Sequence, residues 1–219
     1  MPEPGAPLAI LGGTFDPVHN GHLRVADEVR RALVIDDFRL LPAGQPPHRR
    51  HTHASATDRL AMLQLAVAGR PGLAVDDREV RRPGPSWMLL TLQSLAQENP
   101  CSPLLLVLGQ DSANTLHEWH RWREILPLAH LVVITRPDEP PCYPPSLEPE
   151  MRSREVFDAA LLGRRQGGLV LHLPVQALGI SSTLVRQRLA DGLPVDDLVP
   201  APVLDYIRSH GLYGSARAL

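Results

Sequence analysis

Short apolar runs alternate with stretches of helical apolar spacing through most of this 219-residue chain. Continuous apolar runs are typical of strands buried on both faces of a sheet, whereas a 3.6-residue period indicates an amphipathic helix. The strands predicted in this way are Leu8–Leu11, Phe38–Leu41, Leu73–Val75, Leu104–Leu108, Leu131–Thr135 and Leu169–Leu173. The predicted helices are Gly21–Leu33, Thr57–Ala68, Ser86–Gln97, Arg121–Leu126, Arg154–Leu162, Ser182–Leu189 and Ala201–His210.

This strand–helix alternation predicts an α/β fold with a Rossmann-like, doubly wound parallel sheet, because parallel strands need helical crossovers. The last helices follow the final strand directly. We therefore expect one domain over residues 1–219, with a small helical C-terminal lobe at about 181–213. Six prolines interrupt the pattern in Arg136–Pro149, which we expect to be a connection or a mobile flap.

The composition limits which binding partners and which cellular compartment we expect for this protein. The net charge of −2 gives no sign of a nucleic-acid partner, and no apolar run is long enough to span a membrane. Cys101 and Cys142 lack metal-ligand spacing and are expected to be free thiols of a reducing compartment. The N-terminus lacks the pattern of a signal peptide, so we expect a cytoplasmic protein. The sequence leaves open whether it is a monomer or a homo-oligomer.

The segment 12–22, GGTFDPVHNGH, links the first predicted strand to the first predicted helix. Its two glycines let the backbone approach a ligand closely, and the helix N-terminus favours anions, above all phosphates. His19 and His22 lie at i and i+3, so both side chains can reach the same group. Asp16 precedes Pro17 in a turn, where a structural role is favoured. This segment therefore predicts phosphate chemistry.

A second polar segment, GISSTLVR at 179–186, opens another helix after a predicted strand. Hydroxyl side chains here can cap the helix and donate to an anion, and Arg186 shares a face with Thr183. Such a cluster suits a terminal phosphate. Taken alone, the segment is more typical of an ordinary capping serine with a solvated arginine, because capping hydroxyls are common.

Together the two segments resemble the (H/T)xGH and ISSTxxR motifs of the nucleotidyltransferase superfamily. From about Leu8 to Tyr213 the chain is similar to the bacterial nicotinate-nucleotide adenylyltransferases. The further matching segments are PPHR at 46–49, Arg82–Ser86, GQDS at 109–112, Trp119 and Tyr206–Tyr213. Phosphopantetheine adenylyltransferases share the two signature motifs but lack the PPH loop and the GQD-to-Trp arrangement.

The resemblance implies that the phosphate of nicotinate mononucleotide attacks the α-phosphorus of ATP, giving nicotinate adenine dinucleotide and pyrophosphate. It implies catalytic roles for His19, His22 and Arg186. The ATP-binding residues it implies are Gly12, Gly13, Thr14, Phe15, Gly109, Asp111, Ile180, Ser181 and Thr183. The nucleophile is already ionised, so no general base is required. We expect Mg²⁺ to be carried by ATP, with no protein ligand to the metal, because no carboxylate cage is evident.

The resemblance assigns nicotinate mononucleotide to His48, Arg49, Trp119 and Arg136, with Trp119 stacking on the pyridine ring. Read without it, Trp119 is an ordinary buried indole beside Trp122, and PPHR at 46–49 belongs to a solvated basic loop. Three residues depart from the family pattern. Trp87-Met88 stands where Tyr-Thr is common, and His120 stands where Tyr is expected. Three alternatives stay open: a preference for nicotinamide mononucleotide, a phosphopantetheine substrate, and a nucleotide-binding regulator without turnover.

Overall fold

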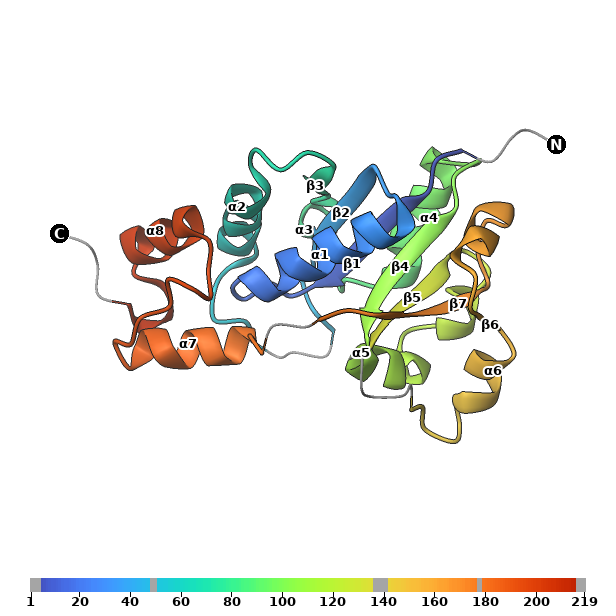
Figure 1. Ribbon diagram of the computed structural model, residues 1–219. Helices are drawn as coiled ribbons and strands as arrows, with labels where there is room; N and C mark the ends of the chain where they lie inside the picture. Colours follow the sequence, from blue (N-terminus) through green and yellow to red (C-terminus); the bar gives the residue numbers. More distant parts are fainter. Residues whose placement is uncertain (1–4, 48–50, 136–141, 177–178, 216–219) are drawn as a thin grey trace. The chain divides into compact units, whose positions relative to one another are not determined.

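The computed structural model describes residues 5–47, 51–135, 142–176 and 179–215 (Figure 1). Its seven strands are β1 (Leu8–Gly13), β2 (Asp37–Pro42), β3 (Leu73–Val75), β4 (Leu104–Gly109), β5 (His130–Thr135), β6 (Glu155–Val156) and β7 (Val170–Pro174). They form one sheet in the order β3-β2-β1-β4-β5-β7-β6. The parallel sheet with flanking helices confirms the predicted Rossmann-like α/β class.

Eight α-helices are found in the described ranges, together with short 3-10 turns. The helices are α1 (Asn20–Leu33), α2 (Ala56–Val67), α3 (Arg78–Arg81), α4 (Met88–Glu98), α5 (Gln110–Asn114), α6 (Glu148–Arg152), α7 (Ser182–Ala190) and α8 (Ala201–His210). No helix in these ranges has both the length and the apolar character to cross a membrane.

The contacts divide the chain into two compact units, each assembled from separate segments. The first unit comprises Met1–Gly12, Glu28–Arg39 and Trp87–Gln176, and the second comprises Gly13–Asp27, Leu40–Ser86 and Ala177–Leu219. Both units therefore draw on the beginning of the chain. That residues 1–219 act as one domain stays a prediction.

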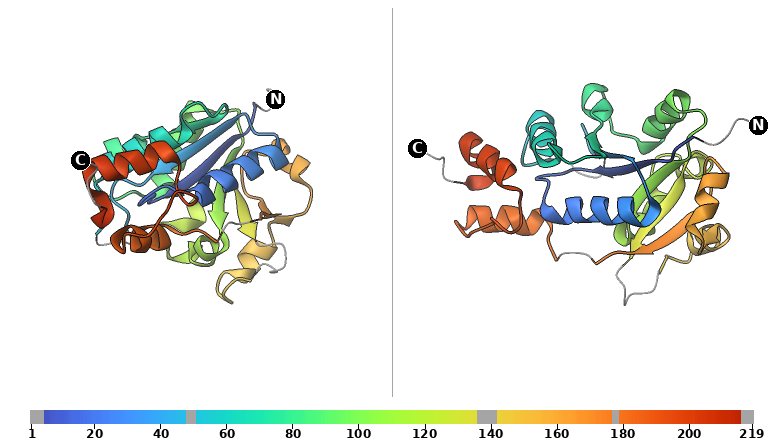
Figure 2. Two further views of the ribbon diagram at one scale, coloured as in Figure 1. Left: turned by 60° about the vertical axis from the view of Figure 1, so that its left-hand side comes forward. Right: turned by 45° about the horizontal axis from the view of Figure 1, so that its top comes forward.

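The core of the first unit is its part of the sheet. β4 pairs in parallel with both β1 and β5, with Leu8 opposite Leu104 and Leu105 opposite His130. β7 then joins β5 to the short edge strand β6 (Figure 2). Every residue of β5 is buried, as expected for a central parallel strand covered on both faces.

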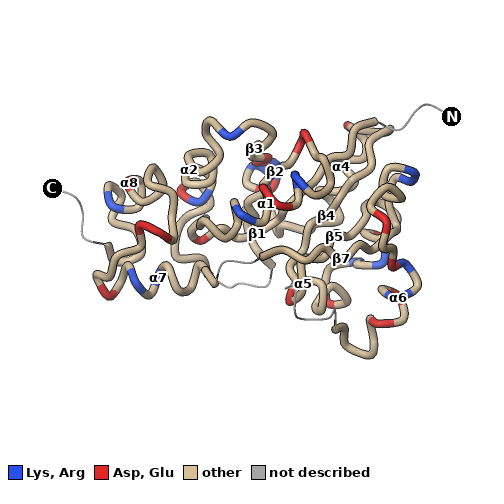
Figure 3. Tube along the Cα trace, viewed as in Figure 1, with Lys and Arg blue, Asp and Glu red and all other residues tan. Residues whose placement is uncertain are grey.

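The second unit contains the helices of the predicted C-terminal lobe. Ser55 caps α2 by accepting a hydrogen bond from the Asp58 N–H (3.1 Å), and the Tyr206 hydroxyl of α8 donates to the Asp58 carboxylate (3.0 Å). α8 ends at Gly211, whose φ of 61° is left-handed and suits a glycine. α2 and α8 each carry both acidic and basic residues, whereas α7 carries arginines and no acidic residue (Figure 3).

Two of the predicted helices are wrong. Arg154–Leu162 contains β6, which pairs with β7, and then a 3-10 turn in which the Asp158 side chain accepts a hydrogen bond from the Ala160 N–H. Arg121–Leu126 contains only a 3-10 turn over Trp122–Glu124, because Arg121 adopts a left-handed φ of 51°. α6 begins within the stretch expected to lack regular structure, of which residues 136–141 lie outside the described ranges.

Candidate functional site

The loop after β1 folds tightly around Phe15. This side chain is 2% exposed, and a Cβ added at Gly13 would lie only 3.1 Å from its ring. Phe15 itself has a φ of 50°, a conformation that side-chain-bearing residues rarely adopt. The ring also packs edge-on against His22, with centroids 4.9 Å apart. The close approach of this ring therefore favours glycine at position 13, because any side chain there would have to displace the Phe15 ring.

Asp16 holds this loop together from inside. Its carboxylate is buried and accepts hydrogen bonds from the Tyr213 hydroxyl (2.8 Å), the His53 N–H (2.8 Å) and the Ala54 N–H (3.1 Å). Burial raises the pKa of Asp16, but these donors outweigh burial and hold the pKa below its ordinary value. The structural role predicted for Asp16 is therefore confirmed. Tyr213 is the partner that sequence analysis missed.

His19 and His22 lie at the start of α1 with their rings stacked, the centroids being 3.7 Å apart. The His22 Nδ1 accepts a hydrogen bond from the His19 N–H (3.2 Å). In the neutral ring, the proton of His22 must then reside on Nε2, which becomes a donor. The His19 Nδ1 is buried and has no hydrogen-bond partner among the described residues. The pair can thus offer ring N–H groups to a ligand.

Both imidazoles are neutral at physiological pH. Burial lowers the pKa of His19 to about 4. Burial and, secondarily, the neighbouring His19 hold the pKa of His22 well below its ordinary value. Neutral rings can stack closely without mutual repulsion and still donate to phosphate oxygens.

The N-terminus of α7 is bonded directly to this loop. The Ser182 hydroxyl donates to the Pro17 carbonyl (2.9 Å), and the Arg186 Nη1 donates to the Asp16 carbonyl (2.7 Å). The Arg186 Nη2 also donates to the Thr183 hydroxyl (3.2 Å), which confirms that these two residues share a face. The two motifs, far apart in sequence, therefore form one cluster within the second unit.

The end of α7 that belongs to this cluster is rich in hydrogen-bonding groups. Ser181 caps the helix by accepting from the Leu184 N–H (3.1 Å), and its side chain is exposed. The carbonyl of Ile180 lies 3.5 Å from the position that a Cβ on Gly21 would take, so the two segments pass closely. The helix N-terminus, two hydroxyls and a guanidinium form an arrangement suited to a polyphosphate.

Arg59 of α2 is a supporting residue that sequence analysis missed. Its side chain is buried, and its guanidinium donates to the carbonyls of Thr14 (2.6 Å) and Gly44 (3.1 Å). Burial lowers the pKa of Arg59, while Asp16 and Tyr213 raise it. The available signal was its helical spacing from Met62 and Leu63, which places an arginine on the buried face.

The first unit holds the other predicted ATP contacts. Gly12 is close to the end of β1, where an added Cβ would meet the flexible tip of Met88 at 2.7 Å. Gly109 ends β4, and Asp111 follows in the first turn of α5 with an exposed side chain. Both strands therefore present their carboxyl ends at these residues, where parallel sheets bind ligands.

Trp119 belongs to the same unit and is half-buried, whereas Trp122 is the buried indole of the pair. Two of the three residues that depart from the family pattern contact each other, since the rings of Trp87 and His120 stack at 4.7 Å. A partly exposed indole next to a stacked aromatic pair offers a flat surface to a heterocyclic ring.

Three predicted residues, His48, Arg49 and Arg136, lie outside the described residues. Within the described ranges, no group of three or more histidine, cysteine or acidic side chains is arranged to hold a metal ion. Both cysteines are free and exposed.

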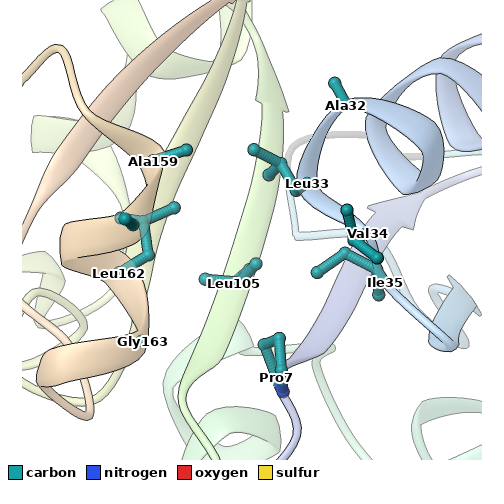
Figure 4. Close-up of a pocket in the computed structure, with 10 residues that line it drawn as sticks. Pro7, Ala32, Leu33, Val34, Ile35, Leu105, Ala159, Leu162 and Gly163 are labelled. Atoms are coloured by element: carbon teal, nitrogen blue, oxygen red, sulfur yellow. The ribbon is translucent and has the colours of Figure 1, made fainter.

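An apolar hollow of about 330 Å³ lies at the opposite ends of the strands in the first unit (Figure 4). Pro7 precedes β1, and Leu105 is near the start of β4. The hollow is lined by Pro7, Ala32, Leu33, Val34, Ile35, Leu105, Ala159, Ala160, Leu162 and Gly163. None of these side chains is polar, so the hollow does not suit a phosphate.

Comparison with known proteins agrees with this geometry. The family model described as cytidylyltransferase-like matches residues 10–188. A protein of Aeromonas salmonicida, whose name reads "Probable nicotinate-nucleotide adenylyltransferase", is 44% identical over 95% of this chain and 97% of its own. A protein of Aeromonas hydrophila with the same name is 46% identical over 96% of this chain and 98% of its own.

Among solved structures, the nicotinic acid mononucleotide adenylyltransferase of Plasmodium falciparum complexed with NaAD has the same fold. Its TM-score is 0.70 at 16% identity, with 96% of this chain and 98% of that chain covered. The fold, the joined motifs and the near-full-length relatives lead to one conclusion. The chain belongs to the cytidylyltransferase-like family and, within it, to the nicotinate-nucleotide adenylyltransferases.

Proposed function

We propose that this protein transfers the adenylyl group of ATP to nicotinate mononucleotide, releasing pyrophosphate and forming nicotinate adenine dinucleotide. The observation that carries the proposal is the direct bonding of the two motifs, Arg186 to the Asp16 carbonyl and Ser182 to the Pro17 carbonyl. This bonding gathers ring N–H donors, hydroxyls and a guanidinium at one place. No general base is needed there, since the attacking phosphate is already an anion.

The catalytic task is to align two polyanions and to stabilise the charge that develops in the transition state. In this proposal the α-phosphate lies at His19 and His22, whose neutral rings donate without competing for a proton. The β- and γ-phosphates lie at Ser181, Thr183 and Arg186, where the guanidinium fork stabilises the leaving pyrophosphate. Gly12, Gly13, Thr14 and Phe15 supply the backbone between them.

Mg²⁺ enters with ATP as part of the substrate. Asp16 is the carboxylate nearest to the histidines in the loop, but its oxygens already accept from Tyr213, His53 and Ala54. It is therefore a poor candidate for a metal ligand, and the phosphates and water are left to coordinate the ion.

The same proposal assigns nicotinate mononucleotide to Trp119, His48, Arg49 and Arg136. Trp119 stacks on the pyridine ring in this proposal. Asp111 and Gly109 contact the ribose of ATP beyond the end of β4.

The proposal is tested by detecting nicotinate adenine dinucleotide by mass spectrometry after incubation with ATP, Mg²⁺ and nicotinate mononucleotide. Trp119→Ala should raise the KM for nicotinate mononucleotide about tenfold and leave that for ATP within twofold, as expected for loss of one stacking contact. Trp119→Phe, which keeps an aromatic ring, is the matched control. Its KM for nicotinate mononucleotide should lie between the values of the wild type and Trp119→Ala. An equal rise in both KM values would contradict the stacking assignment.

A further inference from the structure

Asp111 lies on α5, a helix that is too short to be stable without contacts to other segments. α5 has only five residues, and its N-cap, Gly109, has no side chain with which to cap it. Helices this short are unstable without outside contacts, because nucleation costs more than so few hydrogen bonds return. Something other than helix propensity must fix the direction in which the exposed Asp111 carboxylate points.

Gln110 supplies two such contacts from one side-chain amide. Its Nε2 donates to the Asn114 Oδ1 (2.8 Å), joining the first and last residues of α5. The same nitrogen donates to the main-chain carbonyl of Cys142 (3.1 Å), 32 positions further along the chain. Because a single NH₂ group makes both bonds, α5 is braced internally and tied to a second segment at once.

The segment that receives this bond is itself anchored. Tyr143, next to Cys142, is 5% exposed, and its hydroxyl lies 3.3 Å from the His172 Nε2 of β7. The same His172 nitrogen lies 3.3 Å from Glu155 of β6. Leu147 is fully buried a turn further on. The Cys142 carbonyl is therefore held against the edge of the sheet and offers Gln110 a fixed acceptor.

We infer that Gln110 is a positioning residue, which orients Asp111 toward the ribose of ATP by clamping α5 to the anchored segment at Cys142 and Tyr143. The inference rests on the proposed function, since that assigns the ribose to Asp111. Gln110 makes no contact with substrate in this account and acts through the helix that carries Asp111. Its loss should weaken recognition of the ribose hydroxyls and leave the transfer step intact.

The test compares the wild type with Gln110→Met, which keeps the length of the side chain and removes both hydrogen bonds. Asn114→Asp is the matched control, because it keeps an acceptor for Gln110. KM and kcat are measured with ATP and with 2′,3′-dideoxy-ATP. Amide hydrogen exchange is followed in residues 110–115. Tyr143→Phe tests the anchor separately.

We expect Gln110→Met to raise the KM for ATP about 5- to 10-fold with kcat within about twofold, the loss expected when one charge-assisted hydrogen bond is misaligned. The ratio of the KM values for dideoxy-ATP and ATP should fall toward one, as in Asp111→Ala, and exchange in α5 should accelerate. Tyr143→Phe should change the KM for ATP, the KM ratio and the exchange rate in α5 in the same direction, but by less. Asn114→Asp should resemble the wild type.

An unchanged KM ratio in Gln110→Met, or a fall in kcat equal to the rise in KM, would overturn the positioning role. Wild-type discrimination between ATP and dideoxy-ATP that survives Asp111→Ala would overturn it as well. A wild-type protein that forms no dinucleotide would overturn the proposed function, and this inference with it. If the wild type is active and Gln110→Met has the same KM ratio as the wild type, this inference alone would be overturned.

Discussion

Arg186 donates from Nη1 to the main-chain carbonyl of Asp16 at 2.7 Å, although 170 positions separate the two residues. The bond leaves the rest of the guanidinium to Thr183 and to a bound anion. Asp16 in turn fixes the loop from inside through its carboxylate. One residue, Asp16, thus links the buried support of the loop to the guanidinium that we propose binds the phosphates.

Arg186→Lys keeps the charge but removes the planar fork that reaches the Asp16 carbonyl and Thr183 together. We expect kcat/KM for ATP to fall about 100-fold, because arginine and lysine are not equivalent at bidentate sites. Pyrophosphate release at varied ATP concentration measures this. Arg188→Lys, on the same helix, is the control and should stay within twofold of the wild type. Equal values of kcat/KM for Arg186→Lys and Arg188→Lys would show that the guanidinium of Arg186 has no specific role in the reaction with ATP.

The stacked histidines should act on the transition state rather than on binding. His19→Ala or His22→Ala is expected to lower kcat about 100-fold or more with little change in KM, as for loss of a donor to developing charge. Steady-state kinetics, with circular dichroism to show that the fold is retained, provides the measurement. Near-normal turnover in both variants would refute this mechanism.

Lowering the pH should reduce the free energy of unfolding, because the buried His19 ring stays neutral in the fold. Its pKa is about 4 in the fold against an ordinary 6.5, so the unfolded chain takes up a proton between these values and the folded chain does not. Folding stability contributed by the neutral ring is therefore lost as the pH falls from 6.5 to 4. His19→Gln should lose less stability than the wild type between pH 7.5 and 4.5, by about 2 kcal/mol.

Urea unfolding of both proteins at the two pH values measures this difference. Titrating groups distant from His19 contribute equally to both proteins and cancel in the comparison. His22, whose pKa His19 lowers, adds to the difference in the same direction. Identical losses for the two proteins would mean that the His19 ring is protonated in the fold near its ordinary pKa.

The hydrogen bond from Tyr213 to the buried Asp16 should be worth more to stability than the bond from Tyr206 to the less buried Asp58. Tyr213→Phe removes a donor from a buried carboxylate and is expected to cost about 2 kcal/mol. Tyr206→Phe removes the similar bond to Asp58, whose partners are only half-buried, and should cost less than about 1 kcal/mol. Urea unfolding of the two variants distinguishes them. The reverse order would argue against Asp16 as the centre of the loop.

Six of the seven described strands were predictable from sequence because each contains a short, mostly apolar run that no helix period explains. Leu73–Val75 coincides with β3, and Leu104–Leu108 differs from β4 by one residue. The pattern failed where tertiary pairing decided the structure. Val156 lies on a strand only because β7 offers an edge beside it, and no local signal in Arg154–Leu162 reveals that edge.

The candidate site was likewise predictable where its features are local in sequence, and not where they depend on tertiary contacts. The anion-binding character of both motifs follows from glycines, hydroxyls and a helix start, which are local features. Their joining does not, since the Asp16–Tyr213 contact spans 197 positions. Arg59 was missed because a basic residue on an amphipathic helix is usually assigned to solvent. The Trp87–His120 stack likewise depends on how two separate loops meet.

The most direct measurement is kcat/KM of the wild-type protein for nicotinate mononucleotide, nicotinamide mononucleotide and phosphopantetheine, each with saturating ATP and Mg²⁺. Our account predicts efficient turnover of the nicotinate nucleotide, with a clear preference over the amide and no turnover of phosphopantetheine. A preference for the amide would keep the phosphate site and revise the pocket at Trp119. Turnover of phosphopantetheine alone, or of none of the three, would contradict the account.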